Sequence, residues 1–144
     1  MSKLRSLAAI LAAVALVALC GCGLAEAAAP FHIGIMTGTV SQQEDELRGA
    51  EKLMEIYGDE AHGGMIKHVT YPDNFMQEME TTISQLVGLS DDPMMKAIIA
   101  STAVPGTTEA YRRIKEKRPD IICLAGNSQE DPGVIGSIAD LTVN

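Results

Sequence analysis

Polar side chains that could bind a ligand follow each of four apolar segments of the chain. Most are hydroxyls and amides, which both donate and accept hydrogen bonds and therefore suit a neutral polar ligand such as a sugar or a nucleoside. They are Thr37, Gly38 and Thr39; Tyr71, Asp73 and Asn74; Ser101 and Thr102; and Asn127, Ser128 and Gln129. Each of these residues alone also fits a turn or a helix cap, so the prediction of a binding site depends on their lying together.

The sequence contains no recognisable catalytic motif. It has no G-x-S-x-G nucleophile turn, no G-x-x-x-x-G-K-[ST] phosphate loop and no H-E-x-x-H metal motif. The histidines His32, His62 and His68 do not have the spacing of metal ligands. We therefore predict no catalytic residue, no metal site and no cofactor.

A phosphate site is the alternative interpretation of the segment from Thr37 to Ser41. Free backbone N–H groups at a helix start attract anions, and the pattern faintly resembles the phosphate loop of flavodoxins. A flavin or nucleotide-phosphate binding protein thus remains a second hypothesis. The absence of Trp and the presence of only three Tyr residues for stacking count against a flavin.

The elements that must position these residues alternate between apolar runs and helical periodicity. Strands are predicted at residues 32–36, 65–70, 96–100, 121–125 and 139–143. Helices are predicted from Ser41, with Glu44 as its capping-box partner, to Gly58, from Asp73 or Asn74, from Thr107 to about residue 117, and as one turn after Asp131. The alternation predicts an α/β fold with a doubly wound, parallel five-stranded sheet of flavodoxin-like strand order.

Side-chain patterns add detail to these elements. The first helix should bury a stripe of Leu47, Ala50, Met54 and Tyr57, and the second a stripe of Met76, Met79, Ile83 and Leu86. Lys67 and His68 interrupt the second strand, which indicates a sheet edge. Because ligands of open α/β sheets bind beyond the carboxyl ends of the strands, the polar residues above are expected along one edge, where the rings of Tyr71 and Phe75 could also pack against a ligand.

The first residues are typical of a bacterial export signal. Lys3 and Arg5 precede an apolar run over residues 7–19, which ends at Cys20, Gly21 and Cys22. Residues 1–21 are therefore predicted to be a signal peptide and residues 22–30 a tether. The end of the run resembles a lipoprotein lipobox, which would place a lipid on Cys22. Residues 25–27 also offer an A-x-A cleavage site, so a soluble periplasmic product is the alternative.

Charge and cysteine content narrow the class of partner. The formal net charge is −8, which argues against nucleic acid because nucleic-acid binding needs clustered Lys and Arg. Contact with a membrane is expected through the lipid anchor only. Cys123 stands within an apolar run, where a buried side chain is expected rather than a disulfide or a reactive thiol.

Five short segments resemble an uncharacterised family of exported proteins related to type I periplasmic binding proteins, the superfamily of the ribose receptor and the basic membrane lipoproteins. They are FHIGIMTGT (31–39), TYPDN (70–74), AVPGT (103–107), EDP (130–132) and ADL (139–141). In that superfamily two α/β lobes close on a small molecule. The resemblance implies that residues 31–144 are the N-terminal lobe of a solute-binding lipoprotein that serves an ABC-type permease or a membrane sensor. No helix follows the last predicted strand, so the chain is expected to be truncated.

Overall fold

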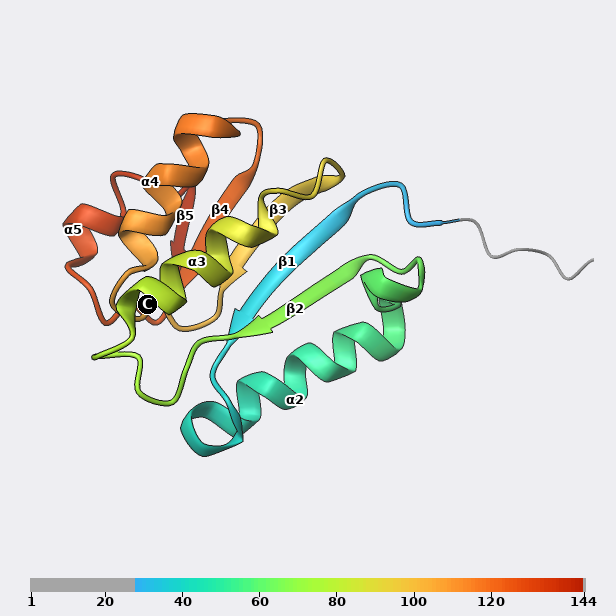
Figure 1. Ribbon diagram of the computed structural model, residues 1–144, viewed down its shortest axis with the longest axis horizontal. Coiled ribbons are helices and arrows are strands. Elements are labelled where there is room, and N and C mark those ends of the chain that lie inside the picture. The colour runs from blue at the N-terminus through green and yellow to red at the C-terminus, as the bar shows by residue number, and fades with distance from the viewer. Residues whose placement is uncertain (1–27, 144) are drawn as a thin grey trace, which may run out of the picture.

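The computed structural model describes residues 28–143 and contains one five-stranded, fully parallel sheet with strand order β2-β1-β3-β4-β5 (Figure 1). The strands are β1 (His32–Thr37), β2 (Ile66–Thr70), β3 (Met95–Ala100), β4 (Ile122–Gly126) and β5 (Leu141–Val143). The helices are α2 (Val40–Tyr57), the 3-10 turn η1 (Glu60–His62), α3 (Met79–Leu89), α4 (Thr107–Lys117) and α5 (Pro132–Ile135). The predicted fold class is confirmed, and β2 lies at a sheet edge as its interrupted pattern indicated.

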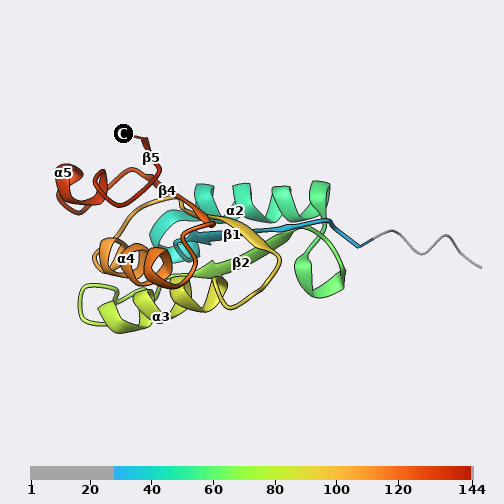
Figure 2. The ribbon, with the colours of Figure 1, turned by 90° about the horizontal axis from the view of Figure 1, so that it is seen from above.

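The helices lie on both faces of the sheet. Figure 2 shows α2 on one side and α3 and α4 on the other. This follows from the strand order: the chain leaves β1 toward β2 and then crosses back over β1 to β3, and right-handed crossovers in opposite directions place their helices on opposite faces. The reversal occurs between β1 and β3, which are neighbours in the sheet.

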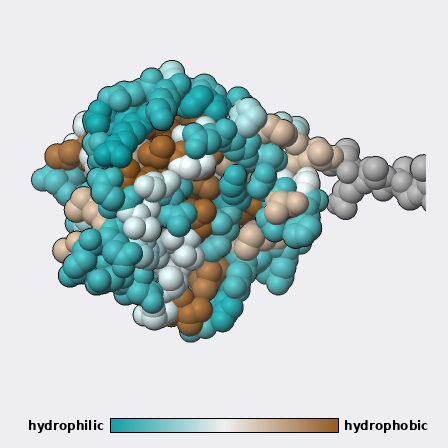
Figure 3. All heavy atoms as spheres, in the orientation of Figure 1, coloured by the Kyte–Doolittle hydropathy of each residue, from teal (hydrophilic) through white to brown (hydrophobic). Residues whose placement is uncertain are grey.

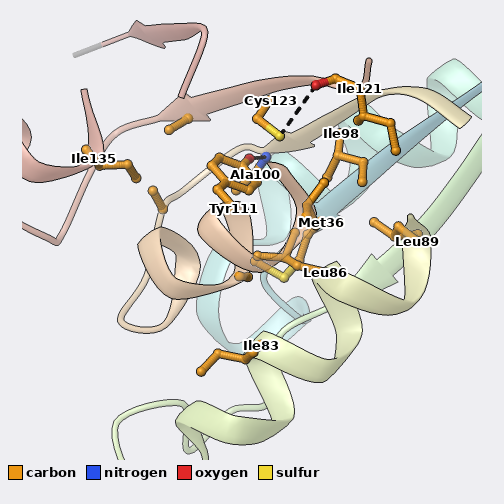
Figure 4. Close-up of a cluster of buried hydrophobic side chains, with 14 of the residues drawn as sticks. Met36, Ile83, Leu86, Leu89, Ile98, Ala100, Tyr111, Ile121, Cys123 and Ile135 are labelled. Carbon is orange, nitrogen blue, oxygen red and sulfur yellow. Dashed lines mark hydrogen bonds between the residues drawn. The ribbon is translucent and has the colours of Figure 1, made fainter. Parts of the chain in front are cut away.

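The larger core fills the space between the sheet and α3 and α4. Met36 and Ile98 from the sheet pack with Leu86, Leu89 and other helix side chains, all at most 2% exposed (Figure 4). Tyr111 of α4 is fully buried in this core; its hydroxyl accepts a hydrogen bond from Ala100 N at 3.0 Å and donates one to the carbonyl of Leu124. The phenol of Tyr111 thus joins β3 to β4 from inside the core.

The face under α2 is only partly covered. Ile35, Ile99, Leu124 and Leu141 form one row across β1, β3, β4 and β5. Ile35 beneath α2 is 5% exposed, whereas Leu141 at the far end of the row is 52% exposed. Ile122 and Val143 on the same face are 52% and 58% exposed. We call Ile122, Leu124, Leu141 and Val143 the bare face; within residues 28–143 no helix covers it.

The start of α2 differs from the prediction. The helix begins at Val40 with Thr39 as N-cap, and no side chain caps it. The Ser41 hydroxyl instead donates to Asp73 Oδ1 at 2.7 Å, so the predicted capping box of Ser41 and Glu44 is wrong. Gln43 has non-helical angles (φ −148°, ψ 69°), so the first turn is set off from the rest of the helix by a kink.

The buried stripe predicted for α2 is confirmed only in part. Ala50 is buried and Leu47 and Met54 are half-buried, whereas Tyr57 is 53% exposed. The helix packs over β1 and β2, and the side chain of Tyr57 in its last turn lies outside that contact. The helix ends at Gly58, as predicted, where the backbone takes φ 80°.

The second predicted helix starts later than expected. Asp73 and Asn74 lie in a turn, and α3 begins at Met79 with Glu78 as N-cap. Met76 and Met79 are 63% and 43% exposed, so they do not belong to the buried stripe. The late start of α3 follows from the partners of Asp73, because its carboxylate accepts hydrogen bonds from Thr39 and from Ser41 in the first turn of α2 and does not cap a helix.

The C-terminal boundaries agree more closely. Thr107 begins α4, and Asp131 caps α5 through Gly133 N at 2.8 Å and Val134 N at 3.0 Å. β5 begins at Leu141, two residues later than predicted, because the Asp140 carboxylate accepts from Cys123 N at 2.7 Å.

The predicted signal peptide, Cys22 and most of the tether lie outside the described residues. Among the residues that are described, no helix is both long and apolar enough to cross a membrane. Figure 3 shows hydrophilic residues over most of the face seen in Figure 1, with hydrophobic residues gathered in a band across its middle.

Candidate functional site

The predicted site residues lie at one edge of the sheet, because each of their four segments follows the carboxyl end of a parallel strand. Thr37 ends β1, Tyr71 follows β2, Ser101 follows β3 and Asn127 follows β4. Since β1 and β3 are neighbours at the point where the strand order reverses, the segments after them border the crevice in which open α/β sheets bind ligands. We call this region the carboxyl edge.

One cluster at the carboxyl edge joins the loop after β1 to the turn after β2. The hydroxyls of Thr39 and Ser41 both donate to Asp73 Oδ1, the latter at 2.7 Å. Gln42 Nε2 also donates to the carbonyl of Asp73 at 2.8 Å. The hydrogen bonds from Ser41 and then Thr39 lower the pKa of the Asp73 carboxyl, which is exposed and stays ionised.

A second cluster lies beside it and includes a residue that was not predicted. The Glu46 carboxylate of α2 accepts hydrogen bonds from the hydroxyls of Ser101 and Thr102, the latter at 2.6 Å. The Ser101 hydroxyl also lies 3.0 Å from the carbonyl of Met36. Thr102 is fully buried, and Ser101 and Glu46 are half-buried. Glu46 stands four residues before the buried Ala50, so an acidic residue on the inward face of α2 was the available sequence signal.

Buried groups form the floor between the two clusters. Thr37 is 1% exposed; its hydroxyl donates to the carbonyl of Gly38 at 2.9 Å and lies 2.8 Å from His68 Nε2. With its own hydrogen so used, Thr37 accepts from His68, and burial lowers the pKa of that imidazole. A Cβ on Gly38 would lie 2.7 Å from the Tyr71 hydroxyl, so only glycine fits there without movement.

Tyr71 does not offer an open ring face. Its side chain is 1% exposed and packs edge-on against Phe75, with ring centroids 5.4 Å apart. In this chain the ring of Tyr71 is therefore closed to a ligand, whereas Phe75 is half-buried. Burial, together with the charge of Glu46, raises the pKa of Tyr71 to about 12.

The loop after β4 completes the edge. Asn127 is exposed and takes φ 35°, and Gln129 N donates to the carbonyl of Ala103 at 2.9 Å. Ser128 is half-buried, with its hydroxyl 3.1 Å from the carbonyl of Glu130. The Glu130 carboxylate accepts from Gly106 N at 3.0 Å and Thr108 N at 2.7 Å, so it occupies the amino end of α4. Sequence reasoning did not assign this role to Glu130.

The carboxyl edge is an open surface in this chain. Asp73, Asn74, Asn127 and Gln129 are exposed on it. A hollow of about 520 Å³ lies elsewhere, against the end of α2 and η1, and is lined by residues that include Tyr57, Asp59, His62 and Met65. A smaller one of about 340 Å³ lies against α4. Neither hollow includes a predicted site residue.

Comparison with known proteins assigns the chain to a family. Residues 31–144 match the family model described as "Protein of unknown function (DUF3798)". The chain belongs to the DUF3798 family. A Treponema pallidum (strain Nichols) protein described as "Uncharacterized protein" is 37% identical over 137 residues, covering 88% of this chain and 62% of the relative. A second match from that organism is 39% identical over 59 residues, covering 41% of this chain and 27% of the relative.

A solved structure shares the fold. It is the crystal structure of a Clostridium difficile 630 protein described as a "Putative transcriptional regulator", with a TM-score of 0.69 and 28% sequence identity. The match covers 76% of this chain and 32% of that protein. This DUF3798 chain therefore spans less than two thirds of the length of the relatives it matches.

Proposed function

We propose that this DUF3798 chain is a ligand-binding lobe of an exported solute-binding lipoprotein, which presents a small polar molecule to an ABC-type permease or a membrane sensor. The observation that carries the proposal is the meeting of two hydroxyl–carboxylate clusters, Thr39–Ser41–Asp73 and Ser101–Thr102–Glu46, at the strand reversal. Polar groups aligned at this point of an open sheet are the usual setting for a bound metabolite.

The hydrogen-bond inventory indicates the kind of ligand. The hydroxyl hydrogens of Thr39, Ser41 and Thr102 are already donated to carboxylates, so these groups offer mainly acceptor oxygens to a ligand. The carboxylates of Asp73 and Glu46 add negative charge to the same edge. A ligand rich in donors, with hydroxyl or amino groups, is therefore favoured over an anion.

The same charges weaken the flavodoxin-like alternative. A phosphate near Ser41 would lie beside the Asp73 carboxylate that its hydroxyl already contacts. Repulsion between the two anions opposes binding. The absorbance spectrum of the purified protein tests this alternative, since bound flavin would overturn the solute-binding proposal.

The solved structure that shares the fold is described as a putative transcriptional regulator, and that description names no ligand. A ligand-binding lobe can serve a sensor as well as a permease, because function depends on the site and not on the fold. The shared fold thus does not discriminate between the two partners.

Mutation of the carboxyl edge tests the proposed site. Sugars, nucleosides and small amines are screened by thermal shift, and affinities are measured by calorimetry. Asn74→Ala, Ser101→Ala and Asn127→Ala are each expected to weaken binding roughly tenfold to a hundredfold, because a ligand group left unpaired costs about 1–3 kcal/mol. Ser84→Ala is the control, since Ser84 is exposed on α3 and its hydroxyl donates only to the carbonyl of Glu80. Equal affinity in all four variants would place the site elsewhere.

The membrane anchor is tested separately. Cys22→Ser should move the protein from the membrane fraction to the soluble periplasmic fraction, because a single lipidated terminus is the proposed attachment. If the wild type and the variant are both soluble, Cys22 carries no lipid.

A further inference from the structure

Three side chains that can bind a metal ion meet at the amino ends of β1 and β3, at the opposite end of the strands from the carboxyl edge. His32 begins β1, Glu60 begins η1, and Asp92 lies in the turn before β3. One imidazole nitrogen and one oxygen from each carboxylate all lie within 4.8 Å of one another. His32 is 9% exposed, and the side chain of Asp92 is 8% exposed.

Two of the three side chains are held firmly by their surroundings. His32 Nδ1 lies 2.6 Å from Asp92 Oδ2, and the other Asp92 oxygen accepts from Met94 N at 2.8 Å. Arg118 donates to the carbonyl of Asp92 at 3.3 Å, which fixes the turn to the end of α4. The imidazole and one carboxylate are therefore positioned before any ion binds.

Glu60 distinguishes this arrangement from a simple ion pair. His32 and Asp92 already pair with each other, so Glu60 is not required as a partner for either of them. Among the described residues, no Lys, Arg or His forms a salt bridge with Glu60. A half-buried carboxylate placed beside another carboxylate raises the energy of the site unless a positive charge lies between them. Burial opposes the ionisation of Asp92, but the hydrogen bonds from His32 and from Met94 N outweigh it and lower the pKa of this carboxyl.

We propose that His32, Glu60 and Asp92 bind a divalent metal ion, with Zn²⁺ the best fit. Imidazole nitrogen and carboxylate oxygen are both zinc ligands, with bonds of about 2.0–2.2 Å, so ligand atoms around a tetrahedral ion lie about 3.4 Å apart. To reach that spacing, Glu60 would move inward from a position within 4.8 Å of the other two ligand atoms, and His32 Nδ1 and Asp92 Oδ2, now 2.6 Å apart, would separate as the ion replaces the hydrogen between them. Three protein ligands leave a fourth position for water.

The ion would tie η1 and the turn before β3 to the first residue of β1. These three segments are far apart in the sequence, and 60 residues separate His32 from Asp92. The site is independent of the proposed carboxyl-edge ligand, because it shares no residue with it. Because such an ion would bind only to the folded chain, it would stabilise the fold.

Zinc titration of the full chain, stripped of metal with a chelator, tests the proposal. One Zn²⁺ per chain is expected to bind with a dissociation constant in the micromolar range or tighter and to raise the melting temperature. Glu60→Gln should weaken binding at least tenfold, and so should His32→Gln if that variant folds. His62→Gln is the matched control, because His62 is an exposed residue of η1 whose imidazole faces Asp59 at 3.1 Å.

Substitution of Co²⁺ for Zn²⁺ distinguishes the proposed site from metal binding by the cysteines in the first residues of the chain. Co²⁺ held by nitrogen and oxygen should show visible d–d bands without sulfur-to-metal charge transfer, and Glu60→Gln should diminish those bands. The proposal is overturned if Zn²⁺ does not bind at 100-fold excess over protein, if Glu60→Gln binds as tightly as the wild type, or if only His62→Gln loses binding.

Discussion

The buried phenol of Tyr111 should stabilise the fold in a way that depends on pH. Its hydroxyl is the partner of Ala100 N at 3.0 Å and donates to the carbonyl of Leu124 within a fully buried site. Tyr111→Phe keeps the ring and removes only this link between β3 and β4. A buried N–H left without a partner costs about 1–3 kcal/mol, so the variant should lose about 2 kcal/mol of unfolding free energy at pH 7.

The sign of the pH effect follows from the pKa of Tyr111, which burial raises well above its ordinary value of 10.0. Above pH 10 the unfolded chain loses this proton while the folded chain keeps it, so the wild type becomes less stable as the pH rises. The contribution is fully present below pH 10 and decreases by about 1.4 kcal/mol per pH unit above it. Tyr111→Phe lacks this titration, so its deficit should shrink from about 2 to less than 1 kcal/mol at pH 11.

The assay is urea unfolding followed by circular dichroism at pH 7 and pH 11, with Tyr57→Phe as the matched control. Tyr57 is 53% exposed, and its substitution should change the unfolding free energy by less than about 0.5 kcal/mol. A loss below 0.5 kcal/mol in Tyr111→Phe at pH 7 would refute the hydrogen-bond argument. An equal deficit at both pH values would refute the argument from ionisation.

Three further predictions concern other parts of the chain. Gly38→Ala should destabilise the protein by about 1–3 kcal/mol in urea unfolding, because the new Cβ would lie 2.7 Å from the Tyr71 hydroxyl. Gly49→Ala is the control; with nothing within 4 Å of its Cβ, it should stabilise the protein by up to about 1 kcal/mol. A Gly38→Ala variant more stable than the Gly49→Ala variant would contradict this packing. Cys123 is buried, and burial raises the pKa of its thiol to about 11. This thiol should therefore react with a thiol reagent at pH 8 only after the protein unfolds. Rapid labelling of the native protein would show that the thiol is accessible to solvent. The bare face should promote self-association, because Ile122 and Leu141 are each 52% exposed on it. Ile122→Thr with Leu141→Ser should therefore shift the sedimentation distribution toward the monomer; an unchanged distribution would show that this face does not drive association.

Much of the fold could be predicted from local pattern. Each strand is a short apolar run bounded by polar or helical segments, and the period of the hydrophobic residues changes from two to nearly four between strands and helices. A helix boundary was predictable where a single residue sets it. Gly58, with its positive φ, ends α2, and the Asp131 carboxylate caps the start of α5. The gathering of the predicted site residues at the carboxyl edge followed from the parallel order alone.

The prediction was wrong where one side chain had two possible partners. Ser41 and Asp73 both looked like helix caps, but in the fold each is the partner of the other across 32 residues. Capping is a local choice, and a contact made by the tertiary structure can replace it. The same reason explains the late start of α3 at Met79.

By itself, the sequence determined the family, the fold class and the edge at which polar residues gather, because those depend on hydrophobic period and strand order. Only the tertiary structure decided that Glu46 joins the site, that Tyr71 is buried, and that His32 meets Asp92. Glu46 and Ser101 are 55 positions apart in the chain, and His32 and Asp92 are 60 positions apart. No local propensity encodes such distances, because the contact exists only after the sheet has brought its strands into register.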